Sequence, residues 1–120
     1  MTLRELSNRG VPELLEGAAL VIQQRGLAKG LRLDPTDGSV DLVAALAVAA
    51  GAKPHELINS VSTQDLPMHP VNEAKFHVAL DVLDAIKPEV ERWADHPSTS
   101  AADVQRLLRQ AAMRLRIAVV

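Results

Sequence analysis

The chain has no cysteine and no tyrosine, and its only aromatic residues among Phe, Trp and Tyr are Phe76 and Trp93. Without cysteine it has no disulfide framework, no cysteine-based zinc or iron–sulfur site and no thiol nucleophile. Hydrophobic residues nevertheless make up 48% of the 120 residues, and most of them are alanine, leucine or valine. A core of such small side chains requires helices that approach one another closely.

The chain also lacks an excess of charge of one sign, since 13 basic and 15 acidic side chains give a net charge of -2. We therefore expect no general binding to nucleic acid or to anionic membranes. The longest apolar run, residues 42–52, has about half of the roughly 20 residues that a membrane-spanning helix needs. Residues 1–10 contain no apolar signal-peptide core, so we expect a cytoplasmic protein.

Hydrophobic periodicity predicts an all-α fold, a compact single-domain bundle of four to six helices over residues 1–120, with residues 1–10 as an N-terminal extension. Pro12 is predicted at the first position of the first helix, and Asp41 at the N-cap of the second. Ser100 and Asp103 resemble a capping box at the start of the last helix. The predicted helices cover residues 12–25, 42–50, 54–61, 70–87 and 89–96, followed by a final helix that ends near residue 118.

Residues 27–40 combine leucines with the turn sequence at residues 34–38. Two interpretations stay open here, a minor β-hairpin near residues 31–40 and an ordered loop whose leucines pack under the first helix. The second helix is apolar almost all round, which is typical of a central helix or of one buried against a second copy of the chain. We expect the apolar end of the chain, residues 117–120, to dock on the domain.

The helix at residues 70–87 has an apolar stripe and a polar face. The predicted stripe consists of Val71, Ala74, Val78, Val82, Leu83 and Ile86. On the polar face, His69, Glu73, His77 and Asp81 recur every four residues and therefore lie along one side. Imidazole and carboxylate groups are suitable zinc ligands, and His55 or His96 would have to supply a further one. We favour a solvated polar face and expect no cofactor, with a metal site formed by Glu73, His77 and Asp81 as the alternative.

The last helix carries Arg106, Arg109 and Arg116 within a limited arc, and Arg114 lies further round. Cations are also favourable in the C-terminal half of a helix, which is the simpler explanation for them. As a functional surface, the stripe would contact an acidic protein surface rather than nucleic acid, because no aromatic residues alternate with the arginines to stack on bases. Trp93 is either part of the core or an exposed anchor of a binding interface.

No nucleophile, phosphate-binding loop or strong catalytic constellation is present in the sequence, so we expect a non-enzymatic protein. The predicted function is that of a small interaction or regulatory protein that binds a protein partner, and a homodimer is a second expectation. The alternative function is a small metal-binding enzyme or sensor that uses the His/Glu/Asp face. The predicted partner-binding residues are Trp93, Asp95, His96, Arg106, Arg109 and Arg116.

Residues 14–26, 37–46, 92–97 and 99–108 together resemble domain-of-unknown-function family 6197, small proteins of high-GC Gram-positive bacteria and their phages. The most specific part of the resemblance is Trp93, Asp95 and Pro97 before the last helix. The chain departs from the family pattern at four positions: Leu27 replaces an aromatic residue, Asp41 a cysteine, Ala44 a glycine and Ala94 an asparagine. The resemblance implies a fold and a bacterial or phage setting, but no activity, and any family chemistry that requires the cysteine or the asparagine would be absent here.

Overall fold

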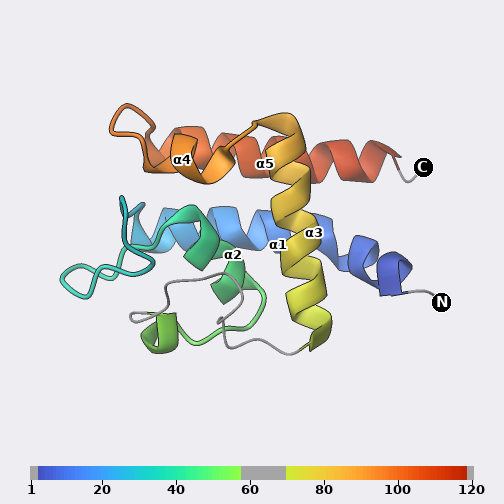
Figure 1. The fold of residues 1–120 in the computed structure, drawn as a ribbon, viewed down its shortest axis with the longest axis horizontal. Coiled ribbons are helices and arrows are strands. Elements are labelled where there is room, and N and C mark those ends of the chain that lie inside the picture. The colour runs from blue at the N-terminus through green and yellow to red at the C-terminus, as the bar shows by residue number, and fades with distance from the viewer. Residues whose placement is uncertain (1–2, 58–69, 119–120) are drawn as a thin grey trace.

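The computed structural model describes residues 3–57 and 70–118 (Figure 1). These residues form five α-helices, a 3-10 helix and no strand, which confirms the predicted all-α bundle. The elements are α1 (Leu3–Arg25), α2 (Leu42–Ala49), η1 (Pro54–Leu57), α3 (Pro70–Ile86), α4 (Val90–Asp95) and α5 (Ala101–Ala118). Among the described residues, no helix combines the length and the apolar character required to cross a bilayer.

The two long helices α1 and α5 lie side by side and run in opposite directions, and α3 crosses them (Figure 1). The buried face of α1 consists of Leu14, Leu15, Ala18, Ala19 and Ile22, as the sequence spacing predicts. α2 packs on α1 so closely that a Cβ atom placed on Gly17 would lie 3.3 Å from the Cβ of Ala49. Small residues thus allow the close helix approach that the composition requires.

The predicted start of the first helix at Pro12 is wrong, because α1 begins at Leu3 and continues through Pro12. Proline removes one backbone donor inside a helix, but its fixed φ is close to the helical value. Val11 is fully buried, so the turn before Pro12 contributes to the core and offsets the lost hydrogen bond. The predicted C-terminus is confirmed, since Gly26 has a φ of 88° and its amide donates to the carbonyl of Ile22 over 2.8 Å.

The segment between α1 and α2 is an ordered loop rather than a hairpin. It contains only isolated β-bridges, from Leu27 to Val40 and from Leu33 to Val40, and no strand is formed within it. Leu33 is buried, whereas Leu31 is exposed, so only part of the leucine set packs beneath the helices. The loop ends at Asp41, whose carboxylate caps α2 by accepting from the amide of Ala44, as predicted.

α2 is the central helix of the domain, with the six residues Leu42 to Ala47 all buried. This position resolves the two interpretations of its apolar character. The helix is covered by this chain's own elements, mainly α1, and is not available to a second copy or to another partner. The short helix predicted over residues 54–61 is present as η1 over Pro54–Leu57, while residues 58–69, which include His69 of the predicted polar face, lie outside the described part.

α3 is present over nearly the predicted range, but its buried face is rotated from the predicted stripe. Phe76, Ala79 and Leu83 are fully buried, whereas Val78 and Val82 are only half-buried. Both sets have helical spacing, so periodicity did not distinguish between them. Phe76 has the larger apolar area, and this helix crosses α1 and α5 with the Phe76 side toward them.

α5 agrees with its prediction most closely. The amide of Asp103 donates to the hydroxyl of Ser100 over 3.1 Å, and the amide of Ser100 donates to the carboxylate of Asp103 over 3.0 Å, which confirms the capping box. The apolar stripe that helical spacing predicts for this helix is buried apart from a half-buried Leu115; its other members are Val104, Leu107, Leu108, Ala111 and Ala112. The predicted docking of the apolar end is wrong for Ile117, which is exposed on the surface of α5, and the side chains of residues 118–120 lie outside the described part.

Candidate functional site

α4 and the residues after it form a well-fixed corner of the molecule, which we call the α4 corner (residues 93–97). Val90 and Ala94 attach the short helix to the core. Glu89 precedes the helix in a left-handed conformation, with φ of 57°, and the amide of Val90 donates to the carboxylate of Asp84 over 3.2 Å. The predicted residues Trp93, Asp95 and His96 therefore lie on a positioned segment.

Lys29 holds this corner from the loop between α1 and α2. Its Nζ donates to the backbone carbonyl oxygens of Ala94 (2.7 Å), His96 (2.8 Å) and Thr99 (2.5 Å). The end of α4 is thus capped by an ammonium group that is more than sixty residues away in sequence. The acceptors are carbonyl groups, which every residue has, so no side-chain pattern could have predicted this role for Lys29.

Replacement of Lys29 by methionine is expected to loosen the α4 corner without unfolding the bundle, because three carbonyl groups lose one shared donor. We expect amide hydrogen exchange at His96 and Thr99 to accelerate about tenfold. The fluorescence of Trp93, the only Trp or Tyr of the chain, should change in parallel. Lys53→Met, at another exposed lysine, is the control, and unchanged exchange in Lys29→Met would contradict the role assigned to Lys29.

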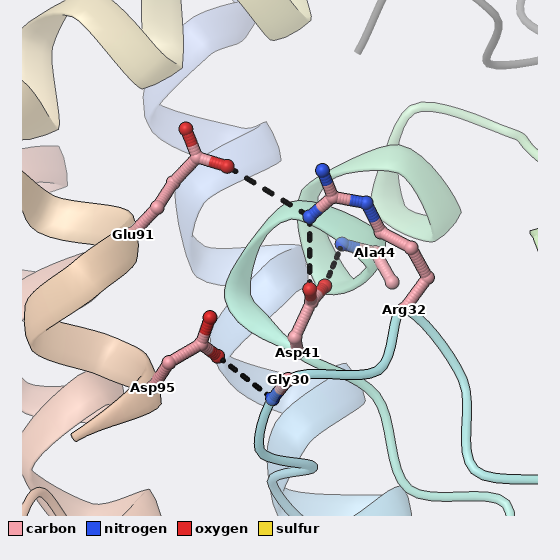
Figure 2. Close-up of polar contacts among 6 residues, drawn as sticks. All are labelled: Gly30, Arg32, Asp41, Ala44, Glu91 and Asp95. Atoms are coloured by element: carbon pink, nitrogen blue, oxygen red, sulfur yellow. Dashed lines mark hydrogen bonds and ion pairs between the residues drawn. The ribbon is translucent and has the colours of Figure 1, made fainter. Parts of the chain in front are cut away.

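A second set of polar contacts joins the same loop to α2 and α4 (Figure 2). Nη1 of Arg32 lies 2.8 Å from Oδ2 of Asp41 and 3.8 Å from Oε1 of Glu91. Asp95 accepts from the backbone amide of Gly30 over 3.3 Å. Asp95, predicted to bind a partner, thus makes an internal contact that fixes the loop against α4.

Asp41 is the most strongly perturbed acid of this cluster, and its side chain is only 7% exposed. Burial raises the pKa of Asp41 from an ordinary value of 3.8 to about 6. The amide of Ala44 and the guanidinium of Arg32 oppose this effect by stabilising the carboxylate, while the negative charge of Asp95 adds to it. All of these groups serve the connection of loop, α2 and α4, which is a structural role.

Trp93 is half-buried, between the two alternatives that its sequence context left open. The ammonium of Lys87 lies 5.2 Å from the centre of its ring, a cation–π contact. A shallow groove of about 500 Å³ runs beside it, bordered by Leu107 and Arg106 of α5. Arg106 also lies 3.6 Å from Asp103, so its charge is partly compensated.

The other two predicted arginines face α1 instead of the groove. Arg116 forms two hydrogen bonds with the carboxylate of Glu16 and lies 3.8 Å from Glu13. The hydrogen bond from Arg116 lowers the pKa of Glu16. Arg109 donates to the side-chain oxygen of Gln23 over 3.4 Å. The six predicted partner-binding residues therefore divide between two surfaces, with Arg109 and Arg116 away from the α4 corner.

A shallow depression of about 580 Å³ lies between α1 and α5 on this second surface. Its lining residues are Glu16, Leu20, Arg109, Met113 and Arg116, and we call them, together with their contact partners Glu13 and Gln23, the α1–α5 seam. Leu20 is 52%, Met113 62% and Ile117 69% exposed. Sequence reasoning missed these apolar residues, although their positions outside the buried stripes of α1 and α5 were a usable signal.

The residues of the alternative metal site are not assembled in the described part of the chain. Nε2 of His77 lies 3.8 Å from Oε1 of Glu73, as expected one helical turn apart. Asp81 is exposed on the next turn, and the described residues contain no group of three metal-ligating side chains. The side chains of His55, one of the two proposed further ligands, and of His69, the first residue of the polar face, lie outside the described part, so the metal alternative stays a hypothesis.

Comparison with known proteins gives one match. A family model described as a family of unknown function (DUF6197) matches residues 7–114. No curated protein and no solved structure matches the chain. The match covers both surfaces, including every residue of the α4 corner and most of the α1–α5 seam, and it confirms the resemblance seen in the sequence.

Proposed function

The chain belongs to the DUF6197 family of unknown function, and from the surface that its fold leaves exposed we propose that it is a non-enzymatic protein that binds another protein chain through the α1–α5 seam. One observation carries the proposal. Of the four large hydrophobic side chains that are prominently exposed in the described residues, Leu20 and Met113 line this seam, and Ile117 lies one helical turn after Met113 on α5. Large apolar side chains gathered on a soluble surface and bordered by polar groups are typical of interaction sites.

The construction of the seam supports binding rather than chemistry. α1 and α5 are the most extensively packed pair of elements, so the seam is a rigid platform that loses little conformational freedom on binding. Its charged groups are fixed by one another, as in the Arg116 and Glu16 pair. Catalysis needs convergent groups with perturbed pKa values in a pocket. The acid with a raised pKa, Asp41, lies elsewhere and caps a helix, and the pKa of Glu16 in the seam is lowered by its hydrogen bond from Arg116, which keeps Glu16 an ion-paired carboxylate.

The finer parts of the sequence-based prediction belong to this proposal as well. A regulatory role, a cytoplasmic location and a setting in high-GC Gram-positive bacteria or their phages remain predictions. The α4 corner stays a candidate for a second contact through Trp93 and Arg106, whereas Asp95 and the backbone of His96 already make internal contacts. We prefer the seam to the α4 corner as the main binding surface, because Leu20 and Met113 are more exposed than Trp93.

The proposal predicts that Leu20→Ser combined with Met113→Ser abolishes protein binding while the helical circular dichroism is unchanged. The immobilised chain is incubated with a lysate of its native host to which untagged copies of the chain are added, and retained proteins are quantified by mass spectrometry. We expect retention to fall at least tenfold, because the two substitutions remove the apolar centre of the surface.

Leu31→Ser is the matched control, because Leu31 has the same 52% exposure as Leu20 but lies in the loop outside the seam. Retention should survive this change. Retention that is equal for the seam variant and the control would show that the seam is not the binding surface. If the unmodified chain retains neither its own copies nor any other protein, the interaction function itself is wrong.

A further inference from the structure

The two ends of the α1–α5 seam carry opposite net charge. At one end, the carboxylates of Glu13 and Glu16 lie on either side of the guanidinium of Arg116. At the other end, Arg109 has a neutral neighbour, Gln23, and makes no ion pair within the described residues. Among the described side chains of the seam, the first end therefore has one negative charge in excess and the second has one positive charge in excess; Lys75, which borders a separate depression with Glu13, lies outside the seam.

The exposed apolar side chains of Leu20 and Met113 lie between these charged ends. The α-helix rises 1.5 Å per residue, so Glu13 and Gln23 are about 15 Å apart along α1. Leu20 lies between them on α1, and Met113 lies across the depression on α5. The surface thus has an acidic end, an apolar middle and a basic end, arranged along one line.

A surface with this order of charges is complementary to itself when its direction is reversed. Homodimers with twofold symmetry require such a patch, because each residue meets its counterpart from the other side of the axis. A rotation that reverses the seam sets the Glu13 end of one copy against the Arg109 end of the other. The same rotation brings the two apolar middles together and removes them from water.

We propose that the partner that binds the seam is a second copy of this chain, docked about a twofold axis that reverses the direction of the seam. This inference rests on the proposed function and names its partner. The arginines of α5 alone would favour a uniformly acidic partner. Such a partner would be repelled by the carboxylates of Glu13 and Glu16 at one end of the seam. A uniformly basic partner would be repelled by Arg109 at the other end. Only a partner that carries charges of both signs, in the reverse order along its surface, is complementary to the whole seam.

The first test is the oligomeric state of the full chain, measured by sedimentation velocity and light scattering over a range of concentrations. We expect a concentration-dependent dimer. Leu20→Ser with Met113→Ser should give a monomer, while Leu31→Ser should leave the dimer unchanged. Circular dichroism shows that each variant is folded, so that a loss of the dimer is a loss of the interface.

The second test uses the charges and depends on the partner being an identical chain. Glu13→Lys and Arg109→Glu are each expected to weaken the dimer about tenfold, because twofold symmetry places every substituted charge at two contacts. Glu13 is 66% exposed, and Arg109 is exposed, so neither change is expected to disturb the fold. In an equimolar mixture, the positive charge introduced at position 13 of one variant faces the negative charge introduced at position 109 of the other, and the unchanged ends still match. Mixing should therefore restore a heterodimer with the affinity of the parent dimer.

The outcomes separate this inference from the proposed function. The proposal that the partner is a second copy is wrong if the chain is monomeric at all accessible concentrations. It is also wrong if the chain dimerises with an affinity that neither the seam variants nor the charge variants change. A mixture that fails to restore association, although both single variants weaken it, overturns the reversed twofold arrangement. If the chain is monomeric but still retains another protein through Leu20 and Met113, the proposed function stands without the dimer.

Discussion

Replacement of Phe76 by alanine is expected to lower the free energy of unfolding by about 3–5 kcal/mol. Phe76 is the largest of the fully buried side chains, and it lies on the face of α3 that packs against the core. The remaining buried residues are mainly alanine, leucine and valine, and the ring of His77, 5.3 Å from Phe76, belongs to a side chain that is 43% exposed, so neither fills the space left by the phenyl group. The value is measured by urea unfolding of the parent and the variant, followed by circular dichroism.

A matched pair on the same helix controls this prediction. Leu83 is fully buried and Leu80 is half-buried, three residues away on α3. Leu83→Ala should lower the free energy of unfolding by about 2–5 kcal/mol. Leu80→Ala should lower it clearly less, because part of the Leu80 side chain is already in contact with water in the folded protein. Equal costs at the two leucines, or a Phe76→Ala variant as stable as the parent, would contradict the orientation of α3 described above.

Replacement of Arg32 by methionine is expected to destabilise the protein by about 2–4 kcal/mol at pH 8 but only slightly at pH 5. At pH 8 the Asp41 carboxylate is charged and buried, and the variant leaves it with the amide of Ala44 but no guanidinium. At pH 5 Asp41 is mostly protonated in the folded state, since burial raises its pKa to about 6, so the lost partner matters little.

The sign of the pH effect follows from linkage. The folded-state pKa of Asp41 lies above its ordinary value, so the folded protein binds the proton more tightly than the unfolded chain. This group therefore favours the folded state below about pH 4, and its contribution declines as the pH rises through about 6. In Arg32→Met the pKa of Asp41 rises further, and the decline extends to higher pH. Urea midpoints of variant and parent between pH 5 and pH 8 measure the difference.

Two variants control this second prediction. Arg92→Met removes an exposed arginine that lies 3.5 Å from Glu89, and it should change stability by less than about 0.5 kcal/mol at both pH values. Adding Asp41→Asn to Arg32→Met should recover part of the loss at pH 8, because asparagine also caps helices but carries no buried charge. A loss for Arg32→Met that is the same at pH 5 and pH 8 would exclude Asp41 as its cause.

Local signals in the sequence were sufficient for the helices with clear ends. The capping box of Ser100 and Asp103, the cap at Asp41 and the glycine end at Gly26 each involve residues within a few positions of one another. Such interactions depend on spacing alone, which a sequence displays directly. The buried face of α3 was not accessible in this way, because two stripes of similar spacing compete and the crossing with α1 and α5 decides between them.

The candidate site was less predictable because it depends on contacts between distant parts of the chain. The arginines of α5 were predicted to form one stripe, but the structure divides them between Trp93 and α1, and this division depends on how α5 lies in the bundle. The clamp at Lys29 joins the loop to α4, 65 residues along the chain, and Arg32 meets Asp41, nine residues away, only after the loop has folded back on itself. Leu20 and Met113 acquire a common surface only when α1 and α5 pack together.

The pairing of α1 with α5 also determines when the protein can fold during its synthesis. These helices are the first and last elements of the described chain, and their mutual packing is the most extensive in the molecule. On a ribosome, α2 and α3 can cover part of the apolar face of α1, but the part that packs on α5 stays uncovered until residues 101–118 have emerged. Contacts between residues that are so far apart in sequence slow folding. Until they form, the uncovered apolar surface of α1 can bind chaperones or aggregate with other chains.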